Sequence, residues 1–173
     1  MVEQHTRLRP LKETDLDAVR GWRNHPNVRA YMYTSHEIGE AEHRAWFKQA
    51  CGDDSRHHLV FEVEEQPVGF VQFSVVDTAA GRADWGFYLA PNAPAGSGAK
   101  LGECALEYAF NRLSLHKICG EALASNERSI RFHERLGFTR EAMLRHHHFD
   151  GENFHDVAGF GLLAAEWKER EGD

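Results

Sequence analysis

A glycine- and proline-rich loop between an apolar strand pattern and a long amphipathic helix constrains the fold of this 173-residue chain most strongly. Residues 82–110 read RADWGFYLAPNAPAGSGAKLGECALEYAF, which predicts a strand over 82–89, a loop, and a helix over 99–113. In the loop, Gly96 and Gly98 let the backbone come close to a ligand, and the N–H groups of the first helical turn point toward it. The loop is therefore a candidate phosphate site. A plain strand–turn–helix junction is the alternative, because glycine loops occur in many unrelated turns.

Composition narrows the classes of partner. The net charge of −7, with histidine neutral, disfavours nucleic acids and anionic membranes. The N-terminus shows no export signal, and no apolar run approaches 18 residues, so we expect neither secretion nor a membrane span. The three cysteines are odd in number and scattered, as is typical of reduced thiols. We therefore expect a cytoplasmic protein.

The remaining segments show further helical and strand periodicity. Thr14 and Asp17 resemble a capping box that opens a helix, and Asn24-His25-Pro26 ends that helix, because proline disfavours helix in the residue before it. We expect strands over residues 5–11, 58–64, 68–76, 117–123, 139–149 and 154–163, and further helices over 40–50 and from Ser125 or Asn126 to Leu136. This order predicts one α/β (α+β) domain with a mixed sheet and helices on both faces.

Three motifs carry a resemblance to a known family. WGFYLAP…GSGAKLGECALEYAF resembles the acetyl-CoA-binding motif of the GNAT acetyltransferase superfamily, and NERSIRFHERLGF resembles its second signature. HDVAGFGLLAAEW resembles the end of the ribosomal-protein-acetyltransferase-like branch. The resemblance covers about residues 82–167, and implies a single domain over 1–173 with a mostly antiparallel sheet and acetyl-CoA as donor. Within it, 1–76 would form mainly the acceptor side, 82–138 the acetyl-CoA core and 139–167 a C-terminal hairpin.

The N-terminal half narrows the resemblance further. WRNHPNVRAYMYTSHEIGEAEHRAWF resembles the start of PseH-type enzymes. Those enzymes N-acetylate the 4-amino group of a UDP-linked amino-dideoxy sugar on the pathway to pseudaminic acid. This resemblance implies a small-molecule amine as acceptor, and the superfamily makes a homodimer plausible. Acetylation of protein N-termini or of other small amines is one alternative, and a non-catalytic acyl-CoA-sensing module is another.

The residues that the resemblance assigns to acetyl-CoA lie at one strand end and two helix starts. The strand edge would pair with the amides of the pantetheine arm, and the loop would hold the pyrophosphate. The set is Phe87, Tyr88, Leu89, Gly96, Ser97, Gly98, Ala99, Lys100, Asn126 and Ser129. Ala93 replaces the family's usual Gln or Arg at the loop start, so binding would depend more on backbone N–H groups. Lys100 as a solvated side chain and Asn126 as a plain N-cap are the alternatives.

Two residues are candidates for proton transfer. His133 stands where the family usually has a tyrosine that acts as general acid, and an imidazole could do the same work. A packed, hydrogen-bonded histidine is the alternative. Asp84 is our first choice for the base, acting through water, against an ordinary solvated or ion-paired aspartate. His36 and His43 are lesser candidates.

The acceptor pocket is expected in the N-terminal half, where aromatic faces could hold a uracil ring and arginines could meet a diphosphate. The predicted substrate residues are Arg23, Asn24, His25, Met32, Tyr33 and His36. Trp22 and Trp46 are expected to face the core instead. His146-His147-His148 lies in a predicted strand, with His146 and His148 on one face, and we expect no metal there.

Overall fold

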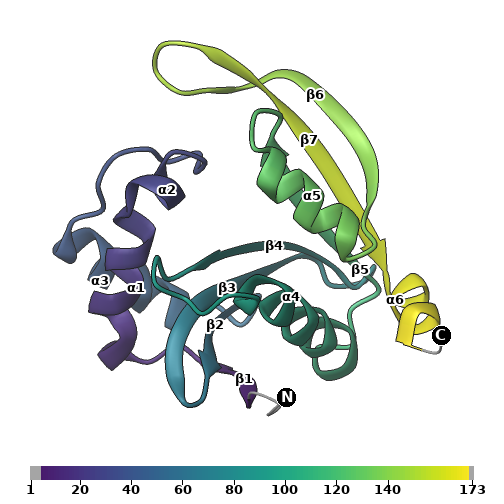
Figure 1. Cartoon of the computed structure of the whole chain (residues 1–173), viewed down its shortest axis with the longest axis horizontal. Coiled ribbons are helices and arrows are strands. Elements are labelled where there is room, and N and C mark those ends of the chain that lie inside the picture. Colours follow the sequence, from purple (N-terminus) through teal and green to yellow (C-terminus); the bar gives the residue numbers. More distant parts are fainter. Residues whose placement is uncertain (1–4, 172–173) are drawn as a thin grey trace.

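One twisted seven-stranded sheet organises the computed structural model, which describes residues 5–171. The strand order is β1-β2-β3-β4-β5-β7-β6, and β4 and β5 are its parallel pair. The strands are β1 (Thr6–Pro10), β2 (Arg56–Val63), β3 (Gln66–Asp77), β4 (Arg82–Leu89), β5 (Lys117–Leu123), β6 (Thr139–Phe149) and β7 (Phe154–Leu163). The predicted mixed, mostly antiparallel sheet is confirmed (Figure 1).

The helices cover both faces of the sheet, as the sequence predicts. They are α1 (Leu16–Asn24), α2 (Pro26–Arg29), α3 (Glu40–Cys51), α4 (Ser97–Glu107), α5 (Glu127–Arg135) and α6 (Ala164–Glu171). Side chains of β3 alternate between the two layers: Phe73 stacks with Trp85 toward α4, whereas Phe70 contacts Tyr88 and the α3 residue Trp46. The core therefore lies between the sheet and α4, and α1 to α3 stand over the other face, at the left of Figure 1.

Strands β4 and β5 diverge soon after they start. Their parallel register joins Arg82 to Lys117, Ala83 to Ile118 and Asp84 to Cys119, and then ends. The rest of β4 continues beside β3, and the rest of β5 continues beside β7. The sheet therefore opens into a V whose apex follows Asp84.

Several sequence predictions about element ends are wrong. The Thr14–Asp17 capping box does not form: Asp15 accepts the N–H of Lys12 at 2.9 Å and opens a 3₁₀ turn, η1 (Glu13–Asp15). The first helix ends at Asn24 as predicted, but Pro26 then opens a further short helix, α2, that the sequence pattern does not predict. The helix predicted from residue 99 begins at Ser97 and passes into a π-helical turn, η2 (Tyr108–Arg112).

The C-terminal hairpin also differs from its prediction. It ends at Leu163 rather than at residue 167, because α6 begins at Ala164. The regular alternation expected for the three histidines is wrong, because the β6–β7 register shifts between Leu144 and His148, and His146 has a φ of +49°. Within residues 5–171, no helix has the length and apolar character that a membrane span needs.

Candidate active site

A cavity of about 880 Å³ lies over the sheet face below α1 to α3 and beside the β6–β7 hairpin. Its floor is formed by β3, β4 and β5, and Phe160 of β7 contributes to the wall. The predicted acceptor side, 1–76, supplies one wall and, through Phe70 and Gln72 of β3, part of the floor. The other wall comes from the hairpin.

Two carboxylates meet on this floor where the strands diverge. Asp84 pairs with Cys119 across β4 and β5, and Glu121 follows two residues later on the same face of β5. Burial, and then the charge of Glu121, raises the pKa of the Asp84 carboxyl. An acid with a raised pKa in a cavity can exchange protons with a bound amine.

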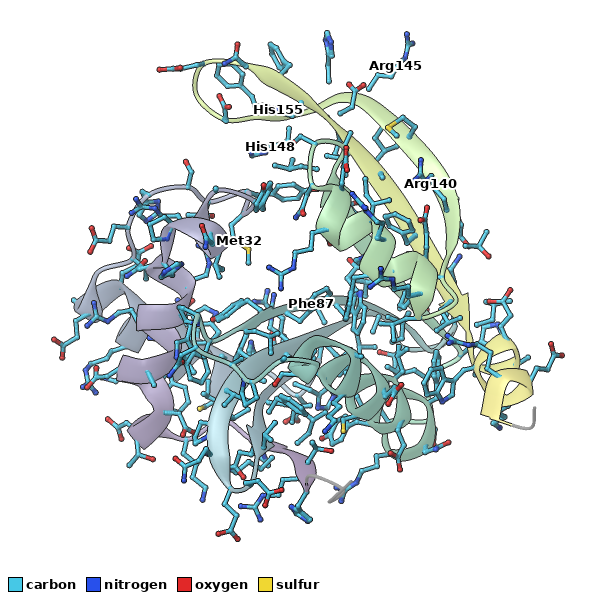
Figure 2. The ribbon with its side chains drawn as sticks, viewed as in Figure 1. Met32, Phe87, Arg140, Arg145, His148 and His155 are labelled. Carbon is cyan, nitrogen blue, oxygen red and sulfur yellow. The ribbon has the colours of Figure 1, made fainter. Side chains whose placement is uncertain are left out.

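Tyr33 connects the two walls of the cavity. Its hydroxyl donates a hydrogen bond to Glu121, and its ring stacks on His148 of β6 with centroids 4.7 Å apart. Burial, followed by the bond to Glu121, raises the pKa of the Tyr33 hydroxyl, so this group keeps its proton. Figure 2 shows His148 above Met32, with Phe87 below both of them. The segment after α2 thus reaches the hairpin above the two carboxylates.

Arg23, near the end of α1, places a guanidinium in the cavity wall. Its Nη2 donates to the carbonyl of Thr34 at 2.8 Å. Its Nη1 is buried and has no hydrogen-bond partner among the residues that the structure describes. Burial lowers the pKa of Arg23, because the charged form has lost water. A negatively charged or oxygen-rich group at this wall would stabilise it.

The glycine loop predicted to hold phosphate meets α4 at its N-terminus. Gly96 caps the helix with a φ of +83°, which L side chains rarely adopt. No atom lies within 4 Å of a Cβ built at Gly96, and at Gly98 the nearest is Leu89 Cδ1 at 3.7 Å. The first-turn N–H groups of a helix lack partners within the helix, although that of Ser97 donates to Pro94. The turn therefore offers open space and donors that fit a pyrophosphate.

Asn126 is the N-cap of α5, which is the alternative to a role in acetyl-CoA binding. Its Oδ1 accepts the N–H of Ser129 at 3.1 Å. This contact explains why the helix begins there. Hydrogen bonding of Asn126 or Ser129 to pantetheine stays a prediction.

His133 is held from both sides of its ring. It is 1% exposed and is not among the residues that line the cavity. Its Nδ1 lies 2.8 Å from the carbonyl oxygen of Ser129, and Trp85 donates its indole N–H to Nε2 at 3.1 Å. Burial lowers the pKa of His133, which favours the neutral ring. The geometry is that of the packed, hydrogen-bonded alternative, and the general-acid role stays a prediction.

With this geometry established, comparison with known proteins gives the family. The family model described as an acetyltransferase (GNAT) domain matches residues 5–139. The chain belongs to the GNAT acetyltransferase family. It is an N-acetyltransferase that uses acetyl-CoA and transfers the acetyl group to an amine.

Curated relatives of this GNAT enzyme include acetyltransferases whose names differ, and spermidine is the acceptor that one of these names gives. It is 26% identical over 129 residues to acetyltransferase PseH of Campylobacter jejuni strain 81-176, a match covering 75% of this chain and 80% of the relative. It is 26% identical over 144 residues to spermidine N(1)-acetyltransferase of Escherichia coli K12, covering 83% of this chain and 77% of the relative. The crystal structure of the Vibrio cholerae spermidine N-acetyltransferase in complex with CoA and spermine superposes with a TM-score of 0.87 at 23% identity, covering 94% of this chain and 98% of that one. This last likeness shows the fold.

The structure brings some predicted residues of the GNAT site together and leaves others apart. Asp84, Phe87, Tyr88, Arg23, Met32 and Tyr33 all line the cavity. Gly96, Ser97, Gly98, Ala99 and Lys100 gather at the separate α4 turn, while Leu89 packs against the core.

Three predicted substrate residues are outside the cavity lining and have local partners. Asn24 clamps the following segment, because its side chain bonds both the N–H and the carbonyl of Ile38. His25 caps α2 by accepting the N–H of Asn27 at 3.3 Å, and His36 pairs with Glu42 on the surface. Substrate contact by these three residues stays a prediction with no support from their positions.

Sequence reasoning missed Glu121 and underrated Trp46. Trp46 lines the cavity, where it contacts Phe70 and stacks on His43, so its assignment to the core was wrong. Glu121 could have been found by pairing the predicted strands 82–89 and 117–123 in parallel, because it then faces the same way as Asp84.

Proposed function

We propose that the acceptor is the amino group of a nucleotide-linked amino sugar, specifically the 4-amino group of a UDP-linked amino-dideoxy sugar. The observation that supports this choice is the Arg23 side chain in the cavity lining, whose buried Nη1 has no hydrogen-bond partner within residues 5–171. A diphosphate would supply the missing acceptors, since arginine pairs with phosphate oxygens in bidentate geometry. A polyamine carries no such group.

Aromatic side chains in the same cavity suit the rest of that substrate. Tyr31, Tyr33 and Trp46 line it, and Trp46 and Tyr88 flank Phe70 in one cluster of rings. Such rings provide flat apolar faces for a pyrimidine or a sugar.

The carboxylates would handle the proton of the amine. Attack by the amine nitrogen on the thioester carbonyl forms the N–C bond and breaks the C–S bond. The nitrogen loses one proton, and CoA leaves as a thiolate that takes up one proton. We assign the proton lost by the nitrogen to Asp84, directly or through one water, with Glu121 raising its basicity. The α4 turn would hold the pyrophosphate of the donor, and the V between β4 and β5 would admit its pantetheine arm. The homodimer that the resemblance makes plausible stays a prediction.

A polyamine acceptor is the second candidate, and a different observation favours it. Four carboxylates line the cavity, namely Glu42, Asp84, Glu121 and Glu141. Several carboxylates in one cavity attract a multiply charged cation. Arg23 and Arg82 lie in the same lining and oppose this attraction.

The Arg23→Gln variant separates the two candidates. If Arg23 binds a diphosphate, this variant raises the KM for a UDP-linked amino sugar at least tenfold and leaves the KM for acetyl-CoA unchanged. For spermidine, removal of a positive charge would lower the KM or leave it unchanged. Arg56→Gln is the matched control, because Arg56 is a surface arginine paired with Asp53. Equal kinetics of both variants with the nucleotide sugar would reject the proposal.

A further inference from the structure

A hydrogen-bonded pair of rings occupies the apex of the V. The β4–β5 register ends at Asp84 and Cys119, and the next residues are Trp85 and Gly120. A Cβ built at Gly120 would lie 2.5 Å from Nε2 of His133 and 2.6 Å from Nε1 of Trp85. The Trp85–His133 hydrogen bond is therefore pressed against the β5 backbone where the strands part.

The pair is fixed from the remaining directions as well. His133 stacks on Phe160 of β7 with centroids 4.7 Å apart and an angle of 11°, and its edge meets Phe138 at 5.1 Å. Trp85 stacks on Phe138 at 5.1 Å and packs against Phe87 at 4.8 Å. These contacts join β4, β7 and α5 at one point.

The bonding pattern fixes which ring nitrogen of His133 carries a proton. The Ser129 carbonyl can only accept, so Nδ1 carries the hydrogen at that contact. The Trp85 indole can only donate, so Nε2 offers its lone pair. Neither nitrogen has an N–H directed at a bound thioester, which a general acid would need.

We propose that Trp85 and His133 act together as a wedge that sets the opening between β4 and β5 and so positions the thioester, with no proton passing through His133. Trp85, a core residue, also contributes to the cavity lining, whereas His133 does not and acts through its hydrogen bond to Trp85. His133 is thus a positioning residue at the place where the family usually has a tyrosine acid.

Two substitutions of His133 separate positioning from proton transfer. His133→Gln keeps an oxygen that can accept from the Trp85 indole but cannot act as an acid near neutral pH. His133→Phe removes the acceptor and leaves the buried indole N–H of Trp85 without its His133 partner. If the two rings act as a wedge, His133→Gln should keep kcat and the KM for acetyl-CoA within about threefold of the values of the unsubstituted enzyme. His133→Phe and Trp85→Phe should each lower kcat at least tenfold and raise the KM for acetyl-CoA at least tenfold. Trp22→Phe is the control for loss of an indole elsewhere.

Readouts other than turnover keep the test decisive. Nitrogen-15 NMR of the unliganded protein should show His133 protonated at Nδ1, with the Trp85 indole N–H protected from exchange. Calorimetric binding of acetyl-CoA without any amine should weaken in the Phe variant and persist in the Gln variant. Two results would overturn the wedge in favour of a general acid. One is a His133→Gln variant that binds acetyl-CoA normally but is as inactive as His133→Phe. The other is loss of the alkaline limb of the pH–activity profile in His133→Gln but not in His133→Phe. A proton on Nε2 would overturn it as well.

Discussion

Asp84 and Glu121 face the same cavity from strands that part immediately beyond Asp84, and the charge of Glu121 adds to burial in raising the pKa of Asp84. A base works only when it is ionised, so activity should fall as the pH drops through this raised pKa. The acidic limb of kcat/KM should therefore lie above the range of an ordinary aspartate.

The Glu121→Gln substitution should move that limb. Removing the neighbouring negative charge lowers the pKa of Asp84, so the acidic limb shifts to lower pH. Asp84→Asn should remove the limb and reduce kcat by about 10²–10⁴-fold. Both are measured as kcat/KM profiles from pH 4 to 9 with a saturating donor. An unmoved limb in Glu121→Gln would show that the limb belongs to another group.

Asp84→Asn should also raise the thermal stability of the protein. A carboxyl whose pKa is higher in the folded state contributes stability below its unfolded pKa and loses it as the pH rises through the folded pKa. The variant should therefore have a higher Tm near pH 7, and the difference should shrink below about pH 3.9. Asp53→Asn is the control of opposite sign, because hydrogen bonds from Ser55 lower the pKa of Asp53. A lower Tm for Asp84→Asn at pH 7 would contradict the reasoning.

The sequence predicts the elements of the site better than their contacts. The strand 82–89 and the hairpin strands have the bounds that periodicity gave, because each carries its own alternating pattern. The roles of residues 24–36 were harder to predict. Asn24 and His25 form hydrogen bonds with nearby backbone groups, and their spacing in the sequence does not indicate these bonds. The role of His133 depends on Trp85, which is 48 residues away in sequence and meets it only in the folded chain.

Alanine substitutions at two glycines of the α4 turn should distinguish an effect on stability from an effect on acetyl-CoA binding. Gly96→Ala forces an L residue to a φ of +83° and should cost roughly 1–2 kcal/mol of unfolding free energy. A methyl group at Gly98, in the first turn of α4, meets only Leu89 at 3.7 Å, so Gly98→Ala should not lower stability, but it should weaken acetyl-CoA binding at least fivefold. Urea unfolding and calorimetry provide the two readouts. Unchanged acetyl-CoA affinity in Gly98→Ala would move the phosphate site away from this turn.

Gly120→Ala should disrupt the apex of the V. Its methyl group would lie 2.5 Å from His133 Nε2 and 2.6 Å from Trp85 Nε1, so the variant should lose about 1–3 kcal/mol of stability. Catalysis should fall with it. Gly21→Ala is the matched control, since nothing lies within 4 Å and a helical alanine should add about 0.5–1 kcal/mol. Full activity of Gly120→Ala would show that the indole–imidazole contact tolerates displacement.

The central claim concerns the acceptor, and one comparison of substrates tests it most directly. The purified enzyme is given acetyl-CoA with UDP- and dTDP-linked 4-amino-dideoxy sugars, with spermidine, and with peptides bearing free N-termini, and CoA release is measured for each. The account predicts that kcat/KM for a UDP-linked amino sugar exceeds that for spermidine and for every peptide by at least a hundredfold. A kcat/KM for spermidine or a peptide that equals or exceeds the value for every nucleotide sugar would contradict it.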